Sequence, residues 1–129
     1  MSILQSLFGG SSKSNNNSQL PWIQFTSESQ VEEIIENSKF KTQLIFKHST
    51  RCGISRMTLN QFQSIFLDSG LKADLYYLDL LSYRKLSNLI AEKFDIRHQS
   101  PQVIIIKNGV VVAHDSHGGI TSLKFSQYT

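Results

Sequence analysis

Residues 46–55 read FKHSTRCGIS, and this stretch decides which fold the rest of the chain supports. An apolar run at residues 44–46 predicts a buried strand, and apolar residues at helical spacing follow the stretch. Cys52, the only cysteine of the chain, therefore lies where a strand ends and a helix begins. The first helical turn presents unpaired N–H groups and the positive end of the helix dipole, which favour the reactive thiolate. Three residues later, where a dithiol oxidoreductase has its second cysteine, the chain has Ser55.

The apolar residues on either side of this stretch alternate between strand and helix periods. Helical spacing predicts three helices, with Ser27 (in a capping box with Gln30) and Ser82 as the expected N-terminal caps of the first and third. The pair Asn108-Gly109 predicts a two-residue hairpin turn, and a short final helix is expected from Ile120 onward. Short apolar runs predict strands at residues 22–25, 44–46, 75–78, 103–106 and 110–112.

This order of elements, βαβαβαββα, is typical of an α/β fold. Strands that alternate with helices pair in parallel through right-handed crossovers, whereas the two hairpin strands are antiparallel. Residues 103–106 are consecutively apolar, as expected of a strand that is buried on both faces. The sequence therefore predicts a mixed central β-sheet that is flanked by helices on both faces.

The composition predicts one folded domain and one polar segment ahead of it. The chain has 129 residues, of which 40% are hydrophobic and 18% charged, and this suits a single core. Residues 9–19 read GGSSKSNNNSQ and predict a flexible tether. We therefore expect a flexible segment over residues 1–20 and the folded domain over residues 21–129. The apolar residues before the tether suit either a small anchor or a disordered start.

The charge pattern and the length of the apolar runs exclude several classes of partner. The net charge is +3, but Lys and Arg are scattered and form no clustered footprint of the kind that nucleic-acid binding requires. No run approaches the roughly 18 apolar residues of a membrane span. Residues 1–8 also lack the basic residues of a signal peptide. We expect a cytoplasmic protein that has no membrane span and no nucleic-acid partner.

A single cysteine excludes an intrachain disulfide and a cysteine-rich metal site, since both need further ligands. The four histidines (His48, His98, His114 and His117) do not supply a zinc site. His114 and His117 are close in sequence, but they follow a strand-like run and lack acidic or thiol companions at ligand spacing, so no metal site is expected. We expect these histidines at the surface or in loops. For His48, two further interpretations stay open: its ring favours the thiolate, or the residue has a structural role at the end of the strand.

The chemistry of the chain is expected to centre on Cys52, because ligands bind beyond the carboxyl ends of the strands in open α/β sheets. Arg51 adds positive charge that favours a thiolate, and Gly53 lets a ligand approach the backbone. Ser55 either donates a hydrogen bond to the sulfur or is an ordinary polar residue of the first turn. It cannot attack a mixed disulfide, so a thiol from outside the chain must resolve one. The alternative for a lone cysteine is an inert small side chain in the core.

A second signal is Ser100-Pro101, which stands immediately before a long apolar strand. A proline at the start of a strand removes a ladder donor at a place where that is tolerated. The functional interpretation is a cis peptide bond that brings the Ser100 backbone beside Cys52, ready to pair with an extended thiol peptide. Thr50, Gly53, Ser100 and Pro101 are thus the residues expected to bind the substrate thiol.

Several separated segments carry a resemblance to a known family: residues 47–52, 54–55, 76–79, 90–94, 97–103, 106–109 and 114–117. In this order they resemble the monothiol bacilliredoxin (YtxJ-like) family of the thioredoxin-like superfamily. The resemblance implies a thioredoxin-like fold and a bacterial setting in which bacillithiol, a cysteine-containing thiol, replaces glutathione. It also implies that Cys52 takes bacillithiol off S-thiolated proteins and that Pro101 is the cis-proline. No tightly bound cofactor is implied: the co-substrate is bacillithiol or another low-molecular-weight thiol, the partners are S-thiolated proteins, and a monomer is expected. The resemblance spans residues 22–125.

Two other functions stay open. The segment Cys52-Gly53-Ile54-Ser55 differs by one residue from the Cys-Gly-Phe-Ser motif of monothiol glutaredoxins, which share a [2Fe–2S] cluster between two subunits. Gly118-Gly119 resembles the double glycine that follows the last strand of those proteins. The remaining hypothesis is a non-catalytic thioredoxin-like interaction domain with an incidental cysteine.

Overall fold

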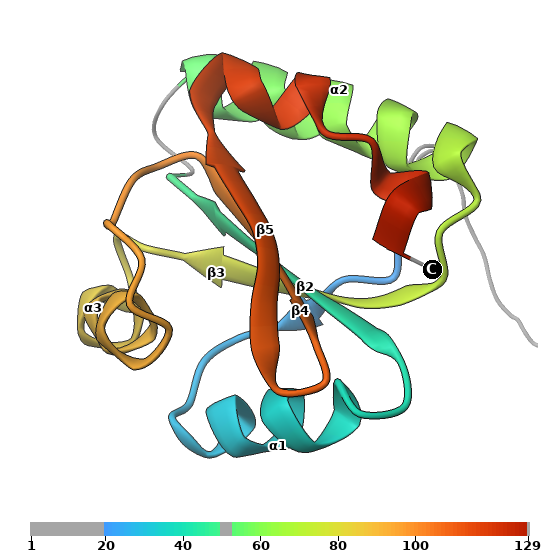
Figure 1. Cartoon of the computed structure of the whole chain (residues 1–129). Helices are drawn as coiled ribbons and strands as arrows, with labels where there is room; N and C mark the ends of the chain where they lie inside the picture. Colours follow the sequence, from blue (N-terminus) through green and yellow to red (C-terminus); the bar gives the residue numbers. More distant parts are fainter. Residues whose placement is uncertain (1–19, 50–52, 129) are drawn as a thin grey trace, which may run out of the picture.

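The structure is a computed structural model that describes residues 20–49 and 53–128, and within α2 the side chains of residues 54 and 55 are not described. Five strands form one sheet in the order β1-β3-β2-β4-β5 (Figure 1). The elements along the chain are β1 (Ile23–Gln24), α1 (Ser29–Asn37), β2 (Thr42–His48), α2 (Gly53–Ser69), β3 (Ala73–Asp79), α3 (Arg84–Lys93), β4 (Gln102–Lys107), β5 (Val110–Ser116) and the 3-10 helices η2 (His117–Ser122) and η3 (Phe125–Tyr128).

The central strand β2 is parallel to its neighbour β3 and antiparallel to its other neighbour β4. The strands β4 and β5 are joined by the predicted two-residue turn, in which both residues have positive φ angles, 51° at Asn108 and 79° at Gly109. A turn of this kind matches the twist of the flanking strands, and Asn and Gly adopt positive φ at low cost. The predicted mixed sheet and the predicted hairpin are both confirmed.

Two apolar layers hold helices against opposite faces of the sheet (Figure 1). On one face, Phe62 and Phe66 of α2 pack with Phe46 of β2, together with residues of η2 and η3. On the other face, α1 and α3 supply Ile34 and Ile90. Residues 103–106 of β4 are fully buried between the two layers, which explains why they are apolar in succession. The predicted α/β class with helices on both faces is therefore confirmed.

The predicted helix caps are partly wrong. Gln30 Oε1 accepts hydrogen bonds from the backbone N–H groups of Thr26 and Ser27, as in a capping box, but the Ser27 hydroxyl pairs with Ser29 Oγ. The N-cap position of α3 is Tyr83. Ser82 instead donates to Asp79 Oδ2 (3.1 Å) within the turn after β3. In both places the serine hydroxyl hydrogen-bonds to a nearby side chain and does not cap a helical N–H group.

The end of the chain forms two 3-10 helices, η2 and η3, where one short final helix was predicted. Ile120 and Phe125 are buried and anchor these two turns beside α2. The predicted flexible segment falls on residues that lie almost wholly outside the described part of the chain, so that prediction stays untested. Among the described residues, no helix has the length and apolar character needed to cross a membrane.

Candidate thiol site

The carboxyl ends of β2 and β3 and the first residues of β4 meet at one edge of the sheet. His48 and Asp79, the last residues of β2 and β3, are register partners, and Gln102 of β4 lies opposite Lys47. The long helix α2 starts at Gly53, so Cys52 directly precedes the helix in the chain. The predicted residues Thr50, Arg51 and Cys52 themselves lie outside the described residues.

Two other predicted residues belong to the first turn of α2. Gly53 is exposed, and a Cβ atom added there would meet nothing within 4 Å. Steric crowding therefore does not require a glycine at this position. Ser55 belongs to α2 by its backbone, and its predicted hydrogen bond to a sulfur falls on a side chain outside the described set.

The segment before β4 has the backbone geometry that the sequence predicts. The peptide bond between Ser100 and Pro101 is cis, and Pro101 is buried. The carbonyl of Pro101 accepts a hydrogen bond from the His117 N–H (3.0 Å), which ties this segment to the end of β5. The Ser100 hydroxyl is buried and has no hydrogen-bond partner among the described residues. The predicted place of Ser100 beside Cys52 stays a prediction.

Lys47 is a fully buried lysine (0% exposed) on the face of β2 opposite α2. Its ammonium group donates to the backbone carbonyl of Ser87 in α3 (3.2 Å) and lies 3.3 Å from His98 Nδ1. An ammonium has only donors, so His98 Nδ1 is the acceptor of this bond. Burial lowers the pKa of Lys47 to about 8. The pKa of His98 is also lowered, by burial and then by the positive charges of Lys47 and Arg84.

Lys47 thus joins three parts of the chain: the strand before Cys52, helix α3, and the loop before Pro101. Gln102 adds a second tie to that loop, since its Nε2 donates to the carbonyl of Arg97 (2.9 Å). The other side-chain atom, Gln102 Oε1, is buried and has no partner among the described residues. The end of β2 and the loop before Pro101 are therefore braced from the α3 side of the sheet.

His48 lies on the α2 side of the same edge, and its predicted surface position is wrong. The residue is buried, with its ring 5.5 Å from the Tyr77 ring and 6.0 Å from the Phe46 ring between centroids. Burial lowers the pKa of His48; the charge of Asp79 raises it and that of Arg56 lowers it. His48 Nδ1 has no hydrogen-bond partner among the described residues. The predicted thiol site therefore has, four residues before the cysteine in the chain, a buried imidazole whose burial lowers its pKa.

Comparison with known proteins places this geometry in a family. The family described as monothiol bacilliredoxin BrxC matches residues 23–125. The chain belongs to the monothiol bacilliredoxin family. The match covers the cysteine, the cis-proline segment and all five strands of the bacilliredoxin sheet, and it supports a thiol redox role.

Solved structures agree with this assignment. One is described only as a candidate oxidoreductase with a thioredoxin fold; it is 35% identical with a TM-score of 0.71, over 84% of this chain and 94% of its own. Thioredoxin from Schistosoma mansoni is 21% identical with a TM-score of 0.64, over 84% and 95%. Thioredoxin from Trypanosoma brucei brucei is 16% identical with a TM-score of 0.63, over 88% and 94%. The last two show the thioredoxin fold alone.

The double glycine after β5 has a packing explanation in this bacilliredoxin. A Cβ atom at Gly119 would overlap the carboxylate of Asp115, whose Oδ1 accepts a hydrogen bond from the Ser116 N–H (2.8 Å). Gly118 has open space around it. Packing therefore accounts for the glycine at position 119 but not for the one at position 118.

The structural roles of Lys47 and Gln102 were not predicted from the sequence. Both are polar residues inside strands that are otherwise buried, and this was the available signal. A lysine within a run such as residues 44–48 suggests either a strand edge or a buried cation with dedicated partners. The partners of Lys47 are distant in sequence, so only the tertiary structure identifies them.

Replacing His48 with phenylalanine is expected to make the stability of the chain less sensitive to acid. The folded-state pKa of His48 lies below its usual value near 6.5, so below that pH the unfolded chain binds more protons than the folded one. Wild-type stability therefore falls as pH drops below about 6.5. Urea unfolding between about pH 7 and about pH 5 measures the difference. His98 makes the same contribution to the pH dependence of stability in wild type and variant, so it does not affect the difference between them. Parallel curves of stability against pH for the two proteins would contradict the role of His48 in the acid sensitivity.

Proposed function

We propose that this chain is a monothiol thiol–disulfide oxidoreductase that removes bacillithiol, or a similar low-molecular-weight thiol, from S-thiolated proteins. The observation that carries the proposal is the single Cys52 directly before α2, in a member of the monothiol bacilliredoxin family. The cis Ser100–Pro101 bond at the start of β4 supports it. The proposed setting is the cytoplasm of a bacterium that makes bacillithiol, with the protein acting as a monomer.

The proposed reaction has two exchanges. In the first, the Cys52 thiolate attacks the bacillithiol sulfur of the client's mixed disulfide. A disulfide forms between Cys52 and bacillithiol, the client disulfide breaks, and the client sulfur leaves as a thiolate that takes up a proton. In the second, an external thiolate attacks the Cys52 adduct and restores the Cys52 thiolate. Across the two exchanges, the client thiol is restored, one external thiol is consumed, and that thiol ends in a disulfide with bacillithiol, so the number of disulfide bonds is unchanged.

We propose that the residues around Cys52 stabilise its thiolate and bind the substrate thiol. The N-terminus of a helix as long as α2 (17 residues) favours a negative charge on the preceding sulfur. Arg51 adds a positive charge, and Ser55 is proposed to donate a hydrogen bond to the sulfur. Thr50, Gly53, Ser100 and Pro101 are proposed to bind the substrate thiol. Lys47 is a positioning residue, because it links the strand before Cys52 to the loop before Pro101.

Intact mass spectrometry tests the proposal directly. Mixing the reduced chain with a bacillithiolated client is expected to move one bacillithiol mass from the client to the chain, and peptide mapping is expected to find it on Cys52. Added bacillithiol should then return the chain to its original mass. A client that keeps its modification in the presence of excess chain would contradict the proposal.

The cluster-carrier alternative rests on the one-residue likeness of residues 52–55 to the glutaredoxin motif. Anaerobic reconstitution with iron, sulfide and a small thiol separates the two functions. A colourless monomer is expected, whereas a brown dimer would favour the cluster carrier. A Cys52 thiol with a pKa near the free value of about 8.5 and slow alkylation would instead favour a non-catalytic domain.

A further inference from the structure

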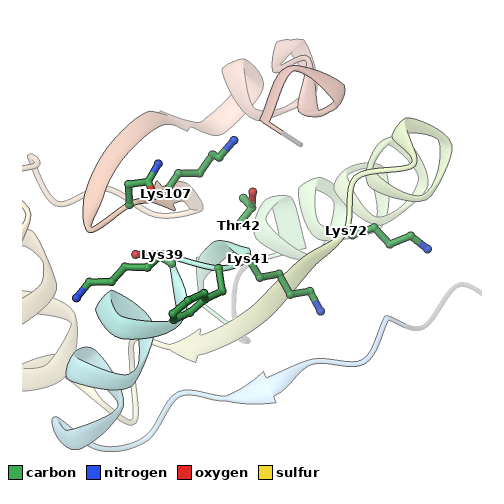
Figure 2. Close-up of a pocket in the computed structure, with 8 residues that line it drawn as sticks. Lys39, Lys41, Thr42, Lys72 and Lys107 are labelled. Atoms are coloured by element: carbon green, nitrogen blue, oxygen red, sulfur yellow. The ribbon is translucent and has the colours of Figure 1, made fainter.

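Four lysines from three segments of the chain gather at the end of the sheet opposite the carboxyl ends of β2 and β3. Lys39 and Lys41 come from the connection between α1 and β2, Lys72 from the connection between α2 and β3, and Lys107 from the end of β4. Together with their neighbours they line a hollow of about 410 Å³ (Figure 2). Among the lining residues there is no acidic side chain. Phe40, also a lining residue, is 88% exposed.

Hydrogen bonds hold the backbone around this hollow, which we call the lysine pocket, in place. The carbonyl of Ser38 accepts from the Asn108 N–H (2.8 Å), and the Ser38 hydroxyl accepts from the Gly109 N–H (2.8 Å). Thr42 Oγ1 donates to the carbonyl of Tyr128 (2.6 Å) on another side. The segments that carry Lys39, Lys41 and Lys107 are therefore fixed relative to one another.

The ammonium groups of the lysine pocket are spread around its rim. Figure 2 shows the arm of Lys39 extending to the opposite side from the arms of Lys41 and Lys72. Lys39 pairs with Glu36 and Lys41 with Asp74, each at 3.1 Å. The Lys39–Glu36 pair is exposed and contributes about 1 kcal/mol or less, so a multivalent anion can recruit Lys39. Asp74 is only 28% exposed, but the Lys41 side chain is 49% exposed and can contact an anion beside this pair. Lys72 has no acidic partner among the described residues.

We propose that the lysine pocket binds a nucleoside polyphosphate, with the phosphates on the lysines and the base stacked on Phe40. Lysine ammonium groups are suitable point charges for phosphate, and an exposed aromatic ring is a stacking platform for a base. The volume of the hollow lies in the range of small-ligand sites. A membrane or an extended nucleic acid fits less well, because the lysines surround one hollow and do not form a stripe or a broad apolar face.

The lysine pocket is distinct from the thiol site. Strand β2 runs from Thr42 at the lysine pocket to His48 at the thiol edge, a distance of about 20 Å at the usual rise per residue. Nucleotide binding therefore needs no thiol chemistry, and its test does not depend on the proposed redox function.

The test is a titration of the ¹⁵N-labelled full chain with ATP, followed by amide chemical shifts. Shifts are expected at residues 38–42, 72 and 107–108, with saturation at millimolar ATP and weaker binding at higher ionic strength. The double variant Lys41→Gln, Lys72→Gln is expected to weaken binding on the order of tenfold, because it removes two charge-assisted contacts. The matched control is Lys85→Gln, Lys93→Gln, which removes the same charge from α3 and is expected to bind ATP like wild type.

Inorganic tripolyphosphate separates the phosphate contacts from the base contact. Phe40→Ala, at an exposed position, is expected to weaken ATP binding while leaving tripolyphosphate binding unchanged. An equal effect of Phe40→Ala on both ligands would overturn the base contact. Three results would each overturn the proposal. The first is that ATP causes no chemical-shift changes at the lysine pocket, and the second is that the α3 control loses as much ATP affinity as the Lys41, Lys72 variant. The third is that the chain binds single-stranded RNA or anionic vesicles but not ATP.

Discussion

Cys52→Ser is expected to lower the rate of de-thiolation of a bacillithiolated client to that of the uncatalysed exchange. The chain has no other thiol, and a serine hydroxyl does not ionise near neutral pH to give a sulfur-attacking nucleophile. No adduct should form on the variant in intact mass spectra. The measurement is the rate of client thiol release under the same concentrations of chain and bacillithiol.

Ser55 supplies the matched controls for this experiment. Ser55→Ala keeps the nucleophile and is expected to retain adduct formation at a reduced rate, because the proposed hydrogen bond to the thiolate is lost. Ser55→Cys adds an internal resolving thiol, so the bacillithiol adduct should give way to a disulfide between residues 52 and 55. Equal de-thiolation by wild type and Cys52→Ser would refute the proposed role of Cys52.

Lys47→Ala is expected to produce the second large effect, a loss of about 3–5 kcal/mol in the free energy of unfolding. The substitution leaves a cavity between β2 and α3 and removes the donor that lies against the Ser87 carbonyl and His98 Nδ1. The loop before Pro101 should lose its tie to β2 at the same time. Urea unfolding at neutral pH measures the stability, and hydrogen exchange of residues 96–101 reports the loosened loop.

Lys47→Met is the matched variant, because it preserves most of the side-chain volume and removes the charge. Its loss of stability at neutral pH should be smaller than that of Lys47→Ala, since burying a charged group is itself costly. The two proteins should also differ in pH dependence. The pKa of Lys47 is about 8 in the folded chain and 10.5, its ordinary value, in the unfolded chain. Between about pH 8 and pH 10.5 the unfolded chain therefore binds more protons than the folded chain.

Wild-type stability should therefore rise relative to Lys47→Met as the pH increases from about 8 towards 10.5, by at most about 3 kcal/mol. Tyrosines titrate in the same range in both proteins, so the difference between the two curves isolates Lys47. A difference in stability that stays constant across this pH range would contradict a buried Lys47 that loses its proton near pH 8. Equal stability of Lys47→Ala and wild type would contradict the bracing role.

Most of the sheet could be predicted from local patterns. The two-residue turn at Asn108-Gly109 depends on backbone preferences of those residues, and the consecutive apolar residues of β4 depend on burial on both faces. The serine caps were less predictable, because Ser27 and Ser82 had competing partners within two or three residues. Hydroxyl groups choose among several acceptors of similar energy, and the sequence does not rank them.

The sequence by itself determined the fold class, the position of Cys52 before a helix, and the absence of a second thiol in the chain. These properties depend on periodicity and on residue identity, which are local. Only the tertiary structure decided that Lys47 meets Ser87 and His98, that His48 is buried, and that scattered lysines meet in the lysine pocket. Those contacts join residues tens of positions apart, and they arise from the order and pairing of strands in the sheet.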